Sequence, residues 1–259
     1  MSTIIKKSLA RLERKLRQTQ SVFLYRRSVP IKLATPIISF TFDDTPQTAF
    51  THGGAILETY GARGTFFVCL GMLEASSPSG TIASRLDLLR AVEQGHELGC
   101  HTFDHRDSWE TLPHVFQMSV HENRKALNRL CPGIVFDSFA YPLCDPRPAT
   151  KRLVGNLFKC CRGGGQAINS GSADLNLLKS FFIDSHKRGC SDSAFRLIDR
   201  NCGLKGWFIF ATHDVDKNPS EYGCTRDDFR EIVAYAASSG SLILPVRKAC
   251  ELIQNESAF

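Results

Sequence analysis

Apolar and polar residues are arranged in alternating blocks along this chain, and the blocks predict strands and helices that follow one another. Short runs rich in β-branched and aromatic residues predict buried strands at 37–42, 64–70, 97–100, 138–141, 178–183, 207–212 and 241–244. Between them, apolar residues recur at helical spacing and predict helices at 49–60, 84–94, 115–130, 148–158, 191–201 and 226–238. This alternation predicts an α/β fold with a mostly parallel sheet. The length of 259 residues favours a closed or nearly closed barrel over an open doubly wound sheet.

The first 32 residues differ from the rest of the chain in charge. They contain nine lysine or arginine residues and one acid, Glu13, which gives this leader a formal charge of +8 in a chain of +6 overall. Ile5, Leu9, Leu12 and Leu16 recur at helical spacing, so we predict a basic amphipathic helix. Two interpretations stay open: peripheral contact with an anionic membrane surface, or docking on the protein's own domain. We therefore divide the chain into a leader, 1–32, and a single domain, 33–259.

The overall composition is that of a globular protein, with 42% hydrophobic and 22% charged residues. No apolar run approaches the length of a membrane span, and the N-terminus lacks the apolar core of a signal peptide. We therefore expect a cytoplasmic protein, with peripheral attachment to the inner membrane surface as the alternative that the leader allows. None of the ten cysteines falls in a CxxC pair, which favours reduced core residues over a disulfide scaffold. Nucleotide-binding glycine motifs and aromatic-interleaved basic patches do not occur, so no nucleic-acid partner is expected.

Polar residues capable of chemistry follow the predicted strands where each strand ends. In a parallel barrel these ends meet at one face, and active sites lie there. The residues concerned are Asp43 and Asp44 after the first strand, His101 and His105 after the third, Asp184 after the fifth, and His213 after the sixth.

The spacing of His101 and His105 in "GCHTFDH" lets two imidazoles bind one metal from a single turn or tight loop. One carboxylate of the adjacent pair Asp43 and Asp44 would complete a two-histidine, one-aspartate site with room for water and substrate. The other carboxylate would be left to accept a proton from that water. By itself, the aspartate pair followed by Thr45 and Pro46 also fits a strand that ends in a solvated turn.

Four motifs, in their order and separations, give this chain a family resemblance. They are "TFDD" after a strand, "GHELGCHTFDH", "FAYP", and a strand that ends in "THD". Together they resemble the polysaccharide deacetylases of carbohydrate esterase family four, the nodulation-type chitooligosaccharide deacetylase domain, over roughly residues 36–250. The resemblance implies a distorted (β/α) barrel of about seven strands. It also implies a hydrolase that removes acetyl groups from sugars with a divalent metal, zinc first and cobalt or nickel as alternatives.

The resemblance also implies a role for each matching residue. It makes Asp43 the general base, His213 the general acid, and Asp44, His101 and His105 the metal ligands. The backbone N–H of Leu143, after the proline of "FAYP", corresponds to the donor that stabilises the oxyanion.

Two further residues are our own predictions, because the chain departs from the family pattern. Many members have an arginine where Ala140 stands, and that arginine pairs with the catalytic aspartate. We predict that Arg162 supplies this guanidinium from the next strand-like segment, "LFKCCRGGG". For Asp184 two interpretations stay open: it holds His213 in its charged form, or it is a solvated residue at the end of its strand. Thr45 replaces the usual glycine after the aspartate pair, and the family's tryptophan-containing motif is not found.

The resulting hypothesis is a metal-dependent hydrolase that removes an acetyl group from an N-acetylated sugar or glycan in polysaccharide biosynthesis. One alternative keeps the metal hydrolase and replaces the sugar with a non-sugar amide. The other is a non-catalytic carbohydrate-binding protein on the same fold, which the replacements at Ala140 and Thr45 would favour. The sequence does not distinguish a free, a nucleotide-linked and a lipid-linked sugar, and it leaves the oligomeric state open.

Overall fold

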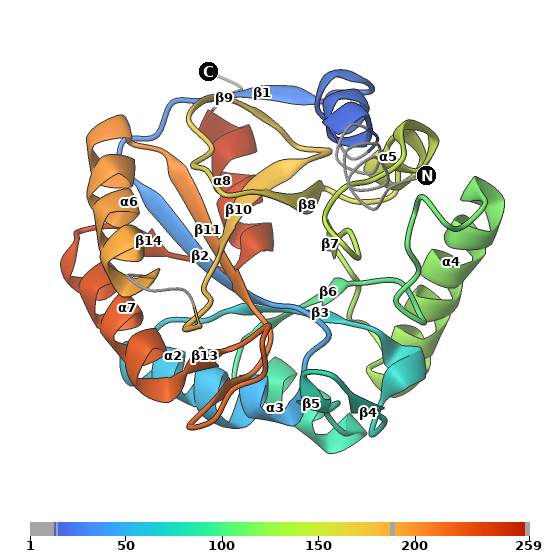
Figure 1. Ribbon diagram of the computed structural model, residues 1–259, viewed down its shortest axis with the longest axis horizontal. Coiled ribbons are helices and arrows are strands. Elements are labelled where there is room, and N and C mark those ends of the chain that lie inside the picture. Colours follow the sequence, from blue (N-terminus) through green and yellow to red (C-terminus); the bar gives the residue numbers. More distant parts are fainter. Residues whose placement is uncertain (1–12, 14, 187–189, 257–259) are drawn as a thin grey trace, which may run out of the picture.

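The computed structural model describes residue 13 and residues 15–186 and 190–256. Seven parallel strands form a closed barrel surrounded by helices (Figure 1). The closing pair is β2 and β11, which are in register from Trp207 opposite Ile37 to Thr212 opposite Phe42. In barrel order the strands are β2 (Ile37–Phe42), β3 (Thr65–Val68), β6 (Glu97–Cys100), β7 (Ser138–Ala140), β8 (Cys160–Gly165), β10 (Leu178–Phe182) and β11 (Trp207–Thr212).

Helices lie around the outside of the barrel, and one further helix packs at its amino end. The outer helices are η1 and α2 (Ala49–Gly54 and Ala55–Thr59), α3 (Arg85–Glu93), α4 (Pro113–Leu130), α5 (Pro148–Gly155), α6 (Cys190–Leu204) and α7 (Arg226–Ser238) (Figure 1). Helix α8 (Val246–Glu256) packs against the first residues of several barrel strands, among them Ile37 and Trp207. Within the described residues, no helix combines the length and apolar character needed to cross a membrane.

Alternation along the strands decides which side chains enter the barrel. In β2, Ile38, Phe40 and Phe42 belong to the apolar layer between barrel and helices, whereas Ile37 belongs to the layer inside. Because successive side chains of a strand point to opposite faces, Asp43 continues the inward series at the carboxyl end. The same alternation turns Arg162 inward in β8, where Cys160 belongs to the inner layer and Cys161 to the outer one.

The predicted barrel of about seven strands is confirmed. However, one of the seven predicted strands, 241–244, lies outside the closed ring, and one strand of the ring is not among those predicted. The barrel strand that the sequence does not predict is β8, because its "CCRGGG" ends in three glycines and therefore resembles a loop. The strand expected at 241–244 is the two-residue strand β14 (Leu242–Ile243), which pairs with the first two residues of β2. The last two residues of the same edge of β2 pair with β3. Helix α8 was not expected.

The segment from residue 28 onward is part of the fold. Strand β1 (Ser28–Ile31) pairs antiparallel with β9 (Gly171–Asp174). Val29 and Ile31 are buried in the same apolar cluster as α8 and the first residues of the barrel strands. Residues 15–23 form a helix that rests on the loop after β7. Of the four apolar positions predicted for the leader helix, Ile5, Leu9 and Leu12 lie outside the described residues.

A buried carboxylate holds the amino end of the barrel together. Glu97, the first residue of β6, accepts hydrogen bonds from the hydroxyls of Thr65 and Ser138, the first residues of β3 and β7, at 2.8 and 2.5 Å. It also accepts the backbone N–H of Arg247 at the start of α8, at 2.8 Å. Glu97 thereby ties three strands and α8 together at the end of the barrel remote from the predicted site.

Candidate active site

Asp43 forms a buried ion pair inside the carboxyl end of the barrel. Both of its carboxylate oxygens accept hydrogen bonds from Nη2 of Arg162, and both side chains are almost fully buried. The guanidinium carbon lies over the rings of Phe67 and Phe182, 5.1 and 5.5 Å from their centroids, and Nη1 donates to the Ser180 hydroxyl at 3.1 Å. These contacts hold Arg162 in one orientation, so the predicted guanidinium lies against Asp43.

Arg162 decides the charge of Asp43. Burial by itself would raise the pKa of this carboxyl, because a charged group loses water on leaving solvent. The Arg162 guanidinium, followed by the imidazoles of His101 and His213, outweighs burial, so the pKa of Asp43 lies below its ordinary value. Asp43 is therefore an anion at neutral pH in spite of its burial.

Asp44, His101 and His105 form a compact cluster beside this ion pair. Asp44 Oδ1 lies 3.3 Å from His105 Nε2 and 3.6 Å from His101 Nε2, and one ligand atom from each residue lies within 4.8 Å of the other two. The backbone turns sharply here, with φ of +55° at Asp44 and +54° at His105. Non-glycine residues adopt this conformation rarely and at some cost, often at functional sites.

The His101 ring is oriented by the neighbouring strand. Its Nδ1 lies 2.8 Å from the carbonyl oxygen of Ala140, which acts as acceptor, so the proton sits on Nδ1 and the lone pair on Nε2 faces Asp44. Burial is the main reason that the pKa of His101 falls to about 4, and the nearby His105 adds to this effect. His101 is thus a neutral imidazole at pH 7, which is the form that binds metals.

The cluster fits a divalent metal in its donor set and spacing. Two ligands bound to zinc at about 2.1 Å with tetrahedral angles lie about 3.4 Å apart, close to the measured 3.3 and 3.6 Å. Asp44 Oδ1 is buried and has no hydrogen-bond partner among the described residues, which is costly for a carboxylate oxygen unless a cation satisfies it. Two histidines and one aspartate are also a typical set for a catalytic zinc site.

His213 lies across the cluster from these ligands. Its Nε2 is 4.0 Å from Asp44 Oδ2, and its Nδ1 is 3.1 Å from the carbonyl oxygen of Tyr222. That contact directs Nε2 toward the cluster. The Asp184 carboxylate accepts the backbone N–H of His186 in its own loop. The acceptor that faces His213 Nδ1 is the Tyr222 carbonyl. A role for Asp184 in charging His213 stays a prediction.

Leu143 lies in a tight turn after β7. Leu143 and Cys144 both have positive φ, +59° and +72°, and the Leu143 side chain is exposed. No acceptor for the Leu143 N–H is found among the described residues. Trp109 Nε1 donates to the carbonyl of Asp145 at 2.7 Å and holds the end of this turn. The turn is therefore fixed in place while the Leu143 N–H has no partner within the described chain.

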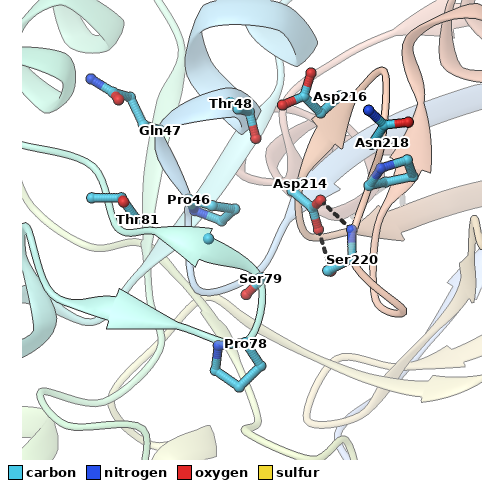
Figure 2. Close-up of a pocket in the computed structure, with 12 residues that line it drawn as sticks. Pro46, Gln47, Thr48, Pro78, Ser79, Thr81, Asp214, Asp216, Asn218 and Ser220 are labelled. Carbon is cyan, nitrogen blue, oxygen red and sulfur yellow. Dashed lines mark hydrogen bonds between the residues drawn. The ribbon is translucent and has the colours of Figure 1, made fainter.

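One cavity of about 310 Å³, large enough for part of a sugar ring and its substituent, is lined by Asp43, Asp44, His101, His105, Leu143 and His213. Met72, Phe182, Tyr222 and the loop Ser77 to Ser79 also line this cavity. A second cavity of about 430 Å³ adjoins it and shares Pro78 and Ser79. Figure 2 shows this second cavity between the turn Pro46 to Thr48 and the loop that carries Asp214 and Ser220.

Asp214 supports the site in a way that sequence reasoning missed. Its carboxylate accepts both the backbone N–H and the hydroxyl of Ser220, at 2.7 and 2.6 Å (Figure 2). A Cβ at Gly223 would collide with the same carboxylate, so only glycine fits there. Asp214 thus holds the loop that presents Tyr222 to His213. The motif "THD" contains this aspartate, but nothing in the sequence pairs it with a loop six residues later.

Comparison with known proteins places these residues in a family. Residues 31–157 match the family described as polysaccharide deacetylase, which includes Asp43, Asp44, His101, His105 and Leu143. A gellan lyase from Bacillus sp is 26% identical over 224 residues, which make up 78% of this chain but only 8% of that protein.

Solved structures agree in fold. A family 4 acetyl xylan esterase from Clostridium thermocellum, in complex with a cobalt ion, has a TM-score of 0.59 at 18% identity, covering 83% of this chain and 91% of its own. The chitin deacetylase from Colletotrichum lindemuthianum has a TM-score of 0.56 at 18% identity, covering 85% and 89%. At these identities the likeness establishes the fold. Over residues 31–157 the chain matches the polysaccharide deacetylase family, and its fold is that of the solved chitin deacetylase and acetyl xylan esterase.

Proposed function

We propose that the protein is a metal-dependent deacetylase that hydrolyses the acetamide of an N-acetylated sugar or glycan. The observation that carries this proposal is the unsatisfied Asp44 oxygen between two imidazoles, directly beside a buried Asp43 that is kept anionic by Arg162. The family match and the structural likeness to a chitin deacetylase support the sugar amide as substrate class.

The metal would be held by Asp44, His101 and His105, with zinc first and cobalt or nickel as alternatives. When bound, it would lower the pKa of a water ligand and polarise the acetyl carbonyl. The acetyl xylan esterase with a cobalt ion supports a divalent metal in this fold.

Asp43 would act as the general base. A base must be ionised at working pH and close to the proton that it accepts, and Asp43 is anionic and adjoins the ligand cluster. Arg162 would act as a positioning residue, since it fixes both oxygens of Asp43 and keeps the carboxylate charged without occupying the cavity.

His213 would donate the proton that the departing sugar nitrogen needs, because an amide nitrogen leaves poorly as an anion. Its Nδ1 contact with Tyr222 leaves Nε2 to carry that proton into the cavity. The Leu143 N–H, which has no acceptor within the described chain, would stabilise the negative charge that develops on the carbonyl oxygen. The exposed ring of Tyr222 would pack on the sugar.

The non-sugar amide stays as an alternative substrate, and the site itself does not distinguish it. A purely sugar-binding protein is disfavoured, because binding alone does not require a buried carboxylate held anionic next to two imidazoles and an unsatisfied aspartate oxygen.

The test is acetate release from a panel of acetylated substrates after removal and controlled return of metal. The panel contains N-acetylated oligosaccharides, O-acetylated xylan and small non-sugar amides. We expect turnover of N-acetyl sugars that disappears with chelator and returns with zinc or cobalt. Turnover confined to small amides would favour the alternative. Sugar binding without acetate release in any metal would contradict the proposal.

A further inference from the structure

The helix at residues 15–23 rests on the domain with its polar side. Gln18 donates to the Asp145 carboxylate at 3.1 Å, and the Ser21 hydroxyl donates to the carbonyl of Pro146. Arg17 lies over the Trp109 ring, 4.9 Å from its centroid. A helix that only covered its own domain would turn its apolar side inward, so this orientation is the reverse of the usual one.

The apolar side chains of this segment face outward. Leu16, Val22, Leu24 and Tyr25 are about half exposed, and Phe23 is 68% exposed. We call these five residues the N-terminal apolar patch. Contiguous exposed apolar groups on a soluble protein typically mark a contact site for a partner or a membrane.

The segment is held firmly enough to present the patch in one place. Lys151 is fully buried, and its Nζ donates to the carbonyl of Ser21 and to the Asp174 carboxylate, at 2.6 Å each. Arg27 donates to three carbonyls at the end of α5 and in the turn that follows, those of Gly155, Phe158 and Lys159. These anchors lie at the end of the helix and directly beyond it, immediately before Val22 and two residues after Tyr25.

The charge around the patch selects its partner. Arg26 and Lys32 follow it in sequence and are exposed, and Arg152 lies over the Tyr25 ring, 5.5 Å from its centroid. The one acid in the first 32 residues, Glu13, is paired with Arg17 at 2.6 Å. Arg17 also lies 3.9 Å from Glu110, whereas no ion pair is found for Arg26, Lys32 or Arg152 among the described residues. Exposed aromatic and aliphatic groups bordered by exposed cations are the pattern of proteins that lie on anionic lipid.

The patch also adjoins the candidate active site. Val22 and Arg26 line a cavity of about 280 Å³ together with Cys144, which also lines the cavity of the ligand cluster. A surface in contact with the patch would therefore lie near the mouth of the site.

We propose that the N-terminal apolar patch and its flanking cations dock the protein on an anionic lipid bilayer, with the mouth of the candidate site near that surface. The inverted polarity of the helix and the excess of positive charge support a bilayer over a second protein. The proposal concerns a binding surface and stands independently of the reaction, so it can fail while the deacetylase proposal holds.

The test is sedimentation of the full chain with two kinds of vesicle, phosphatidylcholine alone and phosphatidylcholine mixed with phosphatidylglycerol. We expect binding to the mixed vesicles that weakens as salt rises, and little binding to the neutral ones. The double variant Phe23→Ser, Leu24→Ser should reduce the partition coefficient about tenfold or more. Neither residue lines the candidate site. Met118→Ser on α4 is the matched control, because Met118 is 66% exposed on a different element, and it should bind as the wild type does.

Equal binding by the double variant and the wild type, or no binding of the wild type to mixed vesicles, would overturn the proposal. So would a dimer in light scattering that dissociates in the double variant, because the patch would then serve a second copy of the chain. Unchanged thermal unfolding of the double variant shows that a loss of binding does not come from misfolding.

Discussion

Asp43 and Glu97 are buried carboxylates at opposite ends of the same barrel, and their surroundings give them opposite character. Asp43 faces a guanidinium and two imidazoles, and its pKa falls below the ordinary value although burial acts the other way. Glu97 is equally buried, and burial raises its pKa. The Arg247 N–H and the hydroxyls of Ser138 and Thr65 offset that rise only in part. Neutral donors satisfy the oxygens of Glu97, whereas a cation fixes the charge of Asp43.

The difference in pKa indicates a catalytic role for Asp43 and a structural role for Glu97. A carboxylate that must accept a proton has to be ionised and face a cavity, and the carboxyl end of the barrel provides both for Asp43. Glu97 joins β3, β6, β7 and α8 at the amino end of the barrel. It does not line the cavity that holds Asp43 and the ligand cluster. Residue type and burial alone would not distinguish Asp43 from Glu97, because both are buried carboxylic acids.

The largest predicted difference is in activity. Asp43→Asn keeps the shape of the side chain but removes the proton acceptor, so we expect kcat/KM for acetate release to fall about 1,000-fold. Glu97→Gln should stay within about threefold of the wild type, because it lies at the other end of the barrel. A similar loss in both variants would show that the comparison is wrong.

The Arg162 guanidinium compensates the buried charge of Asp43. Arg162→Met leaves Asp43 buried without its partner, and we expect the free energy of unfolding at pH 7 to fall by about 3–5 kcal/mol. Denaturant titration measures this loss. The double variant Asp43→Asn, Arg162→Met should recover a large part of it, since no charge is then left unpaired. Additive losses in the double variant would mean that the pair is not coupled.

The two ends should also respond to pH in opposite directions in metal-free protein. The folded-state pKa of His101 is about 4 against an ordinary 6.5, so its contribution to stability is present above pH 6.5 and is lost as the pH falls toward 4. That shift is worth about 3 kcal/mol, and the variant His101→Asn should lack this loss. Asp43, with a lowered pKa, likewise loses its contribution only in acid.

Glu97 has the reverse sign. Its raised pKa means that its contribution is present below the unfolded-state pKa and is lost as the pH rises through the folded-state value. Glu97→Gln should therefore gain in stability relative to the wild type between pH 4 and pH 8. Unfolding curves across that range that run parallel for the two proteins would contradict the assignment.

The smallest effect tests the network around Glu97. Ser138→Ala removes one hydroxyl donor, and we expect a loss of about 1 kcal/mol in unfolding free energy. Acetate release should be unchanged at 25 °C. A clear drop in activity with full stability would mean that the amino end of the barrel contributes to the reaction.

The carboxyl end of the barrel could be predicted from sequence because its residues follow strands directly. Once the strands are placed, alternation and parallel register bring Asp43, His101 and His213 together. Arg162 was inferred from its order in the chain even though its strand was not assigned among the seven, since a run that ends in three glycines resembles a loop.

The amino end and the loops could not be predicted in the same way. Glu97 depends on the hydroxyls of two other strands and on an unexpected helix, and these are long-range pairings that no local pattern encodes. The same holds for the contact of His213 with Tyr222, which a loop held by Asp214 creates. The leader shows a further limit, because the spacing of Ile5, Leu9, Leu12 and Leu16 predicts a helix but not which side of it meets the domain.

The most direct test of the account is bound metal per chain, measured by elemental analysis of protein purified without chelator, for the wild type, His101→Ala and Glu97→Gln. The account predicts close to one zinc, cobalt or nickel ion per chain in the wild type and in Glu97→Gln, and much less in His101→Ala. No metal in the wild type, even after incubation with these ions, would contradict it, and so would equal metal in the wild type and His101→Ala.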